Sequence, residues 1–341
     1  MQNDHPFIIA EMSGNHNHSL DNAFAIIDAA AESGVDAIKI QTYTADTISM
    51  KGVFKIEEKK SLWFGRDLYD LYDEAHTPWD WHEAIFDRAK SQGIICFSSP
   101  FDESAVDLLE SLENPIYKIA SFEINHIPLL KKVASTGKPV IMSTGASSIS
   151  EIEEAVCPLK ENGCKDLVLL KCTSTYPALP IDAHLNTIPH LKQLFNCEVG
   201  LSDHTLGIGV SLAAIALGAK YIEKHFCLSR TAGGVDSEFS MEPEEMRRLV
   251  DESKNVSLSL GQVHYGLTHS ESIVSAGKRS IYVSQDIKIG EKLSESNIKV
   301  IRPGFGLHPR HFHAVLGAVV TSNIQRGSPL LLSDIGNTSL T

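Results

Sequence analysis

Short apolar segments alternate with longer amphipathic segments along the chain, from residue 7 to about residue 258. Most of the apolar segments are unbroken, which is typical of parallel strands buried on both faces. Eight of them are predicted as strands, over Phe7–Glu11, Ala37–Gln41, Ile94–Ser98, Ile116–Ser121, Pro139–Thr144, Leu167–Ser174, Glu198–Asp203 and Tyr221–Phe226.

The segments between these strands have the periodicity of helices. In Leu20–Ser33 apolar side chains recur every three or four residues, and Gly34 follows as a stop signal. The same pattern predicts helices over Pro78–Lys90, Glu103–Leu112, Ile149–Glu161 and Pro243–Leu258. Eight strand–helix units in about 250 residues predict a (β/α)8 TIM barrel. A doubly wound sheet is the alternative, but no G-x-G-x-x-G sequence follows the first strand.

Two regions depart from this alternation. The insert Thr47–Thr77 carries several aromatic residues, and it either covers a substrate or forms an extra helix packed on the barrel. After Gly261 the sequence is first polar and then β-rich, with short pieces separated by Gly and Pro. We therefore expect a barrel domain over 1–262, a linker over 263–279 and a small β-rich domain over 280–341. The strand candidates there are Arg279–Ser284, Leu293, Ile298–Arg302, Val315–Ser322 and Leu330–Ser333.

Composition narrows the class of protein. The 341 residues are 43% hydrophobic, which is enough for a sizeable core, and the formal net charge is -13. Such an acidic chain argues against a nucleic-acid or anionic-membrane surface. No apolar run approaches the roughly 20 residues of a membrane span, and the N-terminus does not resemble a signal peptide. The six cysteines are scattered without a C-x-x-C pair, so we expect reduced thiols and a cytoplasmic location.

Two histidines are the most informative candidates for chemistry. His204 and His225 each follow one of two consecutive predicted strands, with a helix-like segment between them. Neighbouring parallel strands lie roughly 4.8 Å apart, so the two imidazoles are close enough to share one divalent cation. Either histidine alone is more typical of a satisfied core residue, but the paired placement favours a metal site.

The other predicted strand ends are also rich in polar side chains. In a TIM barrel the catalytic groups lie at these carboxyl ends. Three lysines together with several serines predict an anion cradle that suits a phosphate. With the two histidines nearby, the pattern indicates a metal-assisted reaction on a phosphorylated substrate. The candidates are Glu11, Lys39, Gln41, Ser99, Lys118, Ser121, Glu123, Ser143, Lys171, Ser174, Tyr176, Ser202 and Glu223.

Several motifs resemble those of sialic acid synthases, in the expected order along the whole barrel. They are Ala10-Glu-Met-Ser-Gly-Asn-His16, Lys39-Ile-Gln-Thr42, Phe97-Ser-Ser-Pro-Phe101, Tyr117-Lys-Ile-Ala-Ser121, Met142-Ser-Thr-Gly145, Gly200-Leu-Ser-Asp-His-Thr205 and Glu223-Lys-His-Phe226. The tail, with Arg279-Ser-Ile-Tyr282 and Ile301-Arg-Pro-Gly304, resembles the antifreeze-like (SAF) domain of the same enzymes. The resemblance implies a TIM barrel followed by a SAF domain. It also implies condensation of phosphoenolpyruvate with an N-acetylated amino-hexose.

Within this family the details are most similar to the branch that makes pseudaminic acid. The stretches Glu11–Asn17, Gln41–Asp46 and Gly233–Ser240 favour that branch. The neuraminic branch typically has Asn where this chain has Ser174. The implied sugar is 2,4-diacetamido-2,4,6-trideoxy-L-altrose, and the legionaminic and N-acetylneuraminic branches are the alternatives.

The resemblance also implies roles for individual residues. His204 and His225 are expected to hold Mn2+ or Mg2+, and Glu11 to act near the reacting carbons. Phosphoenolpyruvate and the sugar are expected to contact Lys39, Gln41, Ser99, Lys118, Ser121, Glu123, Ser143, Ser174, Tyr176, Ser202, Glu223 and Asp236. A domain-swapped homodimer is expected, in which Arg302 of one protomer reaches the sugar of the other.

Two other functions stay open from the residues alone. A class I aldolase would use a strand lysine as a Schiff base, and Lys39, Lys118 or Lys171 could serve. A non-enzymatic carbohydrate-binding or ice-binding protein would fit the tail, but it would not need the polar barrel mouth.

Overall fold

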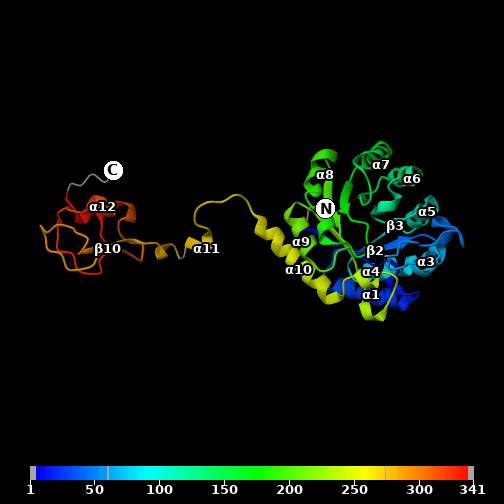
Figure 1. Cartoon of the computed structure of the whole chain (residues 1–341), viewed down its shortest axis with the longest axis horizontal. Coiled ribbons are helices and arrows are strands. Elements are labelled where there is room, and N and C mark those ends of the chain that lie inside the picture. Colours follow the sequence, from blue (N-terminus) through cyan, green and yellow to red (C-terminus); the bar gives the residue numbers. More distant parts are fainter. Residues whose placement is uncertain (1–4, 60, 273, 337–341) are drawn as a thin grey trace. The chain divides into compact units, whose positions relative to one another are not determined.

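The computed structural model describes residues 5–59, 61–272 and 274–336, and the chain divides into two compact units after Gly261. The first unit is a closed barrel of eight parallel strands in chain order, so the predicted (β/α)8 barrel is confirmed (Figure 1). The strands are β1 Phe7–Glu11, β2 Ala37–Thr42, β3 Ile95–Pro100, β4 Tyr117–Ile119, β5 Val140–Ser143, β6 Leu167–Cys172, β7 Glu198–Ser202 and β8 Tyr221–His225.

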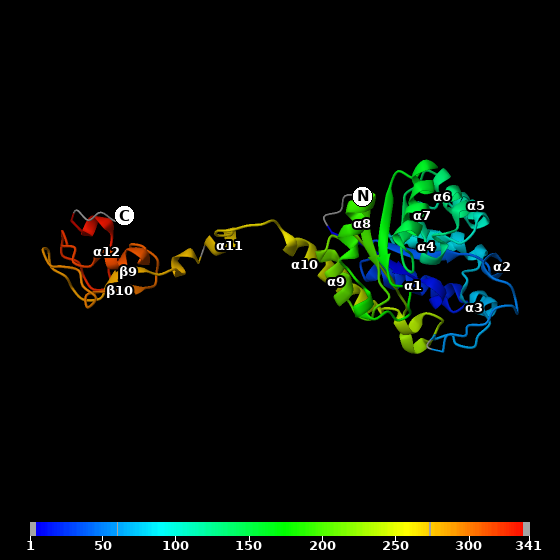
Figure 2. The same cartoon turned by 45° about the horizontal axis from the view of Figure 1, so that its top comes forward.

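Helices surround the barrel on its outer side (Figures 1 and 2). Their starts follow local capping chemistry: Ser148 and Glu151 form a capping box at the start of α7, and Ser19 caps α1. The sequence pattern missed α6, α8 and α9. The covering helices are α1 Leu20–Glu32, α4 His82–Ser91, α5 Glu103–Ser111, α6 Ile127–Ser135, α7 Ile149–Glu161, α8 Thr187–Phe195, α9 Gly209–Ala216 and α10 Pro243–Leu260.

Side chains along each strand alternate between two cores, because successive residues of a strand point to opposite faces. On β1, Ile8 and Ala10 pack in the core that includes the helices, whereas Phe7 and Ile9 belong to a smaller cluster inside the barrel. Counting on by two from the inner cluster reaches Glu11. The inner cluster thus fills one end of the barrel, and the same alternation carries polar side chains into its other end.

The insert of the barrel unit contains two helices, α2 Ala45–Ile48 and α3 Leu68–Ala75. A bridge between Lys55 and Asp67 closes the segment between them, and the Asp67 carboxylate caps α3. Of the two possibilities that the sequence left open, the extra helix is therefore present.

The second unit has a small core of its own. It contains α11 His269–Ser272, an antiparallel pair of β9 Ser280–Val283 and β10 Ile298–Ile301, and α12 Phe312–Val315. The strands predicted over Val315–Ser322 and Leu330–Ser333 were wrong. Val315–Ser322 contributes only isolated bridges, at Val319 and Val320, and Leu332–Asp334 winds into a 3-10 turn because the Asp334 carboxylate accepts a hydrogen bond from the Leu331 N–H. Residues 337–341 of the predicted domain lie outside the described residues.

Across the described residues, no helix has both the length and the apolar character that are required to span a membrane.

Candidate active site at the mouth of the barrel

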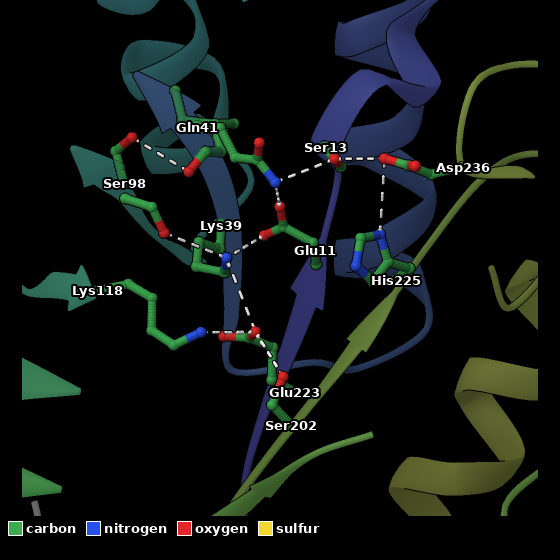
Figure 3. Close-up of polar contacts among 12 residues, drawn as sticks. Glu11, Ser13, Lys39, Gln41, Ser98, Lys118, Ser202, Glu223, His225 and Asp236 are labelled. Carbon is green, nitrogen blue, oxygen red and sulfur yellow. Dashed lines mark hydrogen bonds and ion pairs between the residues drawn. The ribbon is translucent and has the colours of Figure 1, made fainter. Parts of the chain in front are cut away.

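Four buried charged side chains form the floor of the candidate site (Figure 3). The Lys39 ammonium lies 2.7 Å from Glu11 Oε2 and 3.7 Å from Glu223 Oε1. Lys118 donates to the same Glu223 oxygen at 2.8 Å. The strand register explains this meeting, because Glu11 lies opposite Lys39 on β2 and opposite His225 on β8. We call Glu11, Lys39, Lys118 and Glu223 the floor cluster.

The floor cluster contains two positive and two negative groups. Their mutual attraction offsets the energetic cost of burying them. Burial alone would raise the pKa of Glu223, but the ammonium groups of Lys118 and Lys39 lower it to about 2. Burial raises the pKa of Glu11 despite the opposing charge of Lys39. Burial also lowers the pKa of Lys118, against the opposing effect of Glu223. The two carboxyl groups therefore differ: Glu223 holds its charge, and Glu11 takes up a proton more readily.

Hydroxyl groups surround the floor cluster. Ser99 accepts a hydrogen bond from Lys39 at 3.3 Å, and Ser202 donates to Glu223 at 3.1 Å. The buried Ser143 hydroxyl has no hydrogen-bond partner in the described part of the chain. A buried hydroxyl without a partner is uncommon in proteins. Its position at the end of β5 therefore suits an external acceptor such as a phosphate oxygen.

The absence of a side chain at Gly145 allows Ser121, Cys172 and Ser174 to approach one another. A Cβ atom there would lie 2.2 Å from Ser174 Oγ, 2.8 Å from Ser121 Oγ and 3.2 Å from Cys172 Sγ. The Gly145 N–H donates to Ser121 Oγ at 3.1 Å. Any larger residue at this position would displace the two hydroxyls.

The two histidines face each other across the end of the barrel, with ring centroids 5.3 Å apart. His204 Nδ1 lies 2.9 Å from the Thr173 carbonyl oxygen. An N–H at Nδ1 that donates to this carbonyl leaves Nε2 with a free lone pair. Burial, together with the nearby ammonium groups of Lys39 and Lys118, lowers the pKa of His225 well below its usual value, so this ring is neutral at ordinary pH.

These residues fit a divalent cation. His225 Nδ1 is buried without a hydrogen-bond partner in the described structure, and its nearest carboxylate oxygen, in Asp236, is 4.0 Å away. Metal–nitrogen bonds of roughly 2.1 Å allow two imidazoles at this centroid separation to reach one ion. No group of three or more His, Cys, Asp or Glu side chains is arranged for a metal within the described ranges. Two protein imidazoles would leave coordination positions open for a substrate.

A cavity of about 440 Å³ opens beside His225. Its polar lining residues include Gln41, Ser121, Glu123, Tyr176 and Asp236, all of which were predicted as substrate contacts. The Gln41 amide donates to Glu11 at 2.8 Å and to Ser13 at 3.0 Å. The Ser13 hydroxyl in turn donates to Asp236 at 2.5 Å. This chain of hydrogen bonds connects the floor cluster with the cavity wall (Figure 3).

Two predicted residues lie elsewhere. The expectation that Lys171 joins the anion cradle was wrong. The side chain of Lys171 donates to the Cys172 carbonyl and to Thr173, because residue 171 is on the outer alternation of β6. Arg302 follows β10 in the C-terminal unit, where its side chain is exposed.

The sequence pattern did not identify Cys172 as a residue of the site. It also did not reveal that Ser13 connects Gln41 with Asp236 through hydrogen bonds. Cys172 Sγ lies 3.9 Å from His204 Nδ1 and 3.7 Å from Ser174 Oγ. Burial would raise the pKa of the Cys172 thiol, but the contact with His204 lowers it to about 7. Counting by two from Val168 and Leu170, which belong to the inner cluster, would have placed Cys172 inside the barrel.

Comparison with known proteins shows the family to which the chain belongs. A model of the NeuB family matches residues 26–265, and a model of the SAF domain matches residues 278–336. The chain is 44% identical to a pseudaminic acid synthase of Campylobacter jejuni, over 96% of each chain. It is 39% identical to a pseudaminic acid synthase of Helicobacter pylori, over 97% of this chain and 98% of the relative.

A solved structure of an N-acetylneuraminic acid synthetase from Leptospira borgpetersenii, in complex with citrate, is also similar. It has a TM-score of 0.71 and 35% identity, and the match covers 79% of this chain and 90% of that one. The resemblance drawn from the sequence motifs is thus confirmed. The chain belongs to the NeuB family, and its C-terminal part carries a SAF domain.

Proposed function

We propose that this chain is a pseudaminic acid synthase, a transferase that forms a carbon–carbon bond. It condenses phosphoenolpyruvate with 2,4-diacetamido-2,4,6-trideoxy-L-altrose and water, and it releases pseudaminic acid and phosphate. One observation carries the proposal: the buried floor cluster lies beside two imidazoles at the base of a sugar-sized cavity. The similarity to pseudaminic acid synthases over nearly the whole chain supports this choice of branch.

The floor cluster and its hydroxyls are suited to phosphoenolpyruvate. Lys118 and Lys39 offer ammonium groups, and Ser99, Ser121, Ser143 and Ser202 offer hydroxyl donors to the phosphate. A bound anion competes with Glu223 for Lys118. It also favours the protonated form of Glu11, whose pKa burial already raises. The floor cluster can therefore compensate the negative charge of bound phosphoenolpyruvate without any other group.

The sugar occupies the cavity in this proposal. The lining residues Glu123, Tyr176 and Asp236 hold its hydroxyl and acetamido groups, and Gln41 holds it against Glu11. Ser174, beside Cys172, is a further proposed contact. A divalent cation such as Mn2+ or Mg2+, held by His204 and His225, would supply Lewis-acid polarisation of the sugar's carbonyl group. The match to a SAF domain and the exposure of Arg302 support a second role, contact of Arg302 with the sugar in a partner protomer of a domain-swapped dimer.

The bond changes balance without a further co-reactant. C3 of phosphoenolpyruvate bonds to the sugar's carbonyl carbon, and the carbonyl oxygen takes the proton of Glu11 to become a hydroxyl. C2 is left electron-poor, and a water molecule adds there and gives a proton back to the Glu11 carboxylate. The new C2 hydroxyl passes its proton to the phosphate as the C–O bond breaks, which leaves a nine-carbon 2-keto acid and hydrogen phosphate. Glu11 and Glu223 lie where negative charge stabilises the electron-poor centre.

The lysine pairing argues against the class I aldolase. A Schiff-base lysine must be neutral to attack a carbonyl group. Glu11 and Glu223 outweigh burial and raise the pKa of Lys39, while Lys118 donates to Glu223. Lys39 is thus better suited to binding an anion than to forming an imine, and Lys118, although burial lowers its pKa, is held in an ion pair with Glu223.

Phosphate release from phosphoenolpyruvate, measured with metal-replete protein, tests the proposed function. Turnover is expected with the altro sugar, at a kcat/KM at least about 10-fold above that of N-acetylmannosamine or the 2,4-diacetamido-mannose isomer. Preference for either of those two sugars would move the chain to another branch of the family. No phosphate release with any of the three sugars would refute the synthase itself.

The raised pKa of the Glu123 carboxyl group leads to a prediction for the pH dependence of sugar binding. Burial raises the pKa of this carboxyl group to about 7, from an ordinary value of 4.5. The carboxylate accepts stronger hydrogen bonds from sugar N–H and O–H groups than the neutral acid does. We therefore expect kcat/KM for the sugar to rise with pH through about 7, and the Glu123→Gln variant to lose this titration. The surface variant Glu153→Gln serves as the control, and a Glu123→Gln profile identical to that of the wild type would contradict the assignment.

A further inference from the structure

The cavity also has an apolar lining, and the insert supplies most of it. Trp63 and Tyr72 of the insert line the cavity, together with the five aliphatic residues Ile48, Ile56, Leu68, Leu71 and Ala75. None of these five side chains can donate or accept a hydrogen bond. We call these five residues the apolar roof.

The apolar roof is fixed over the cavity by contacts at both of its sides. The Trp63 indole N–H donates to the Val235 carbonyl at 2.9 Å, which joins the insert to the loop that carries Asp236. On the other side, the Tyr43 ring packs against Tyr72 and Phe101 with centroid separations of 5.8 and 5.0 Å. Figure 2 shows the insert passing along the same side of the barrel as the loop around residue 235. The roof is thus an ordered wall of the cavity.

The orientation of the sugar in the cavity follows from the place where the carbon–carbon bond forms. The reacting carbonyl carbon must lie near His225 and the floor cluster, because the carbon–carbon bond forms there. An open-chain hexose extends away from that carbon, so its last carbon lies farthest from the floor cluster. The insert follows the carboxyl end of β2, so its residues lie beyond the strand ends that carry Gln41 and His225. The last carbon of the sugar therefore meets the apolar roof.

We propose that the apolar roof is the specificity element for a sugar that carries a methyl group, not a hydroxymethyl group, at C6. This inference rests on the proposed function and deepens it, since it assigns the choice of a 6-deoxy sugar to particular residues. A methyl group against the roof replaces water at an apolar surface. A hydroxyl at the same place loses its water partners and finds no donor or acceptor among the five roof side chains.

The size of the effect can be bounded. Apolar pockets discriminate between ligands that differ by one such group by factors of roughly 10 to 200. We therefore expect the wild-type protein to favour the 6-deoxy sugar over its 6-hydroxy analogue at least about 10-fold. Both sugars keep the same acetamido groups, so the polar lining residues of the cavity contribute equally to the kcat/KM of both.

Two measurements test the proposal. The first compares kcat/KM for 2,4-diacetamido-2,4,6-trideoxy-L-altrose with that for the analogue that retains the C6 hydroxyl. The second titrates the two corresponding alditols calorimetrically, because these reduced sugars cannot react and so report binding alone. Both measurements are made on the wild type and on an Ile48→Thr/Ile56→Thr double variant, which places hydroxyl groups in the half-buried part of the roof.

The control variant is Val53→Thr, which changes an exposed residue of the same insert that does not line the cavity. The double variant is expected to lower the preference for the 6-deoxy sugar to below about threefold, whereas Val53→Thr retains the wild-type ratio. Thermal unfolding of each variant shows whether it is folded.

The outcomes separate this inference from the function on which it rests. Turnover and binding without discrimination at C6 in the wild type would overturn the role of the roof and leave the synthase intact. An unchanged ratio in a folded double variant would do the same. If neither sugar reacts and neither alditol binds, both the proposed function and the role of the roof are overturned.

Discussion

The Lys118→Met substitution is expected to lower kcat/KM for phosphoenolpyruvate by about 10³-fold. Lys118 is buried, and its ammonium group lies 2.8 Å from Glu223 Oε1 within the floor cluster. A hydrogen bond to a charged group contributes about 1.5–3 kcal/mol, and two such bonds to a phosphate account for roughly 4 kcal/mol. Each 1.36 kcal/mol is a factor of ten in rate. Initial rates of phosphate release at varied phosphoenolpyruvate concentration give the value.

Two further variants make this result interpretable. Lys138→Met removes a half-exposed lysine that pairs with Glu110 at 2.6 Å, and it is expected to change kcat/KM by less than about twofold. Removing one member of a buried pair also destabilises a protein, by about 3–5 kcal/mol. The double variant Lys118→Met/Glu223→Gln removes the unpaired charge and should regain part of this stability without regaining activity. Wild-type kcat/KM in folded Lys118→Met would refute the phosphate-binding role.

Loss of either metal-facing imidazole is expected to abolish tight binding of the divalent cation and to lower kcat by at least about 10²-fold. The reason is that the Lewis acid supplies several kcal/mol of stabilisation only when both rings hold it near the sugar's carbonyl group. His204→Ala and His225→Ala should therefore behave alike, although the pKa shifts of the two rings have opposite directions. Calorimetric titration with Mn2+ measures binding, and phosphate release measures kcat.

The exposed residue His190 on α8 provides the matched control for these variants. His190→Ala should bind Mn2+ like the wild type, and EDTA should inactivate both of these proteins reversibly. Wild-type Mn2+ affinity in folded His225→Ala would show that this imidazole is not a ligand. Activity that withstands EDTA would remove the cation from the reaction.

Much of the barrel could be predicted because parallel strands leave a clear signature. Runs such as Leu167–Leu170 are apolar without interruption, since both faces of each strand are buried. The site followed from the same pattern. A polar residue after an apolar run marks the carboxyl end of a strand, and these ends meet at one face of the barrel. His204 and His225 were placed together on this argument alone, and the structure brings their rings within 5.3 Å.

Other features were beyond the sequence pattern for physical reasons. Helix α9 is apolar almost all round, so its sequence has no amphipathic period to detect. Lys171 and Cys172 are neighbours in the chain but face opposite sides of β6, and a one-residue error in the alternation exchanges their roles. The pairing of Lys118 with Glu223 joins residues 105 positions apart, which no local pattern reveals.

The residues proposed for the reaction and those proposed for the choice of sugar lie in different segments of the chain. The charged groups of the floor cluster lie on the barrel strands, whereas the apolar roof lies in one continuous stretch between β2 and α4. Four of its five side chains are only partly buried, so exchanging them disturbs little of the barrel core. In evolutionary terms, a change of sugar can accumulate by substitution within this stretch while the reaction chemistry stays under separate selection. Recombination that exchanged the insert as a unit would transfer the preference in a single event.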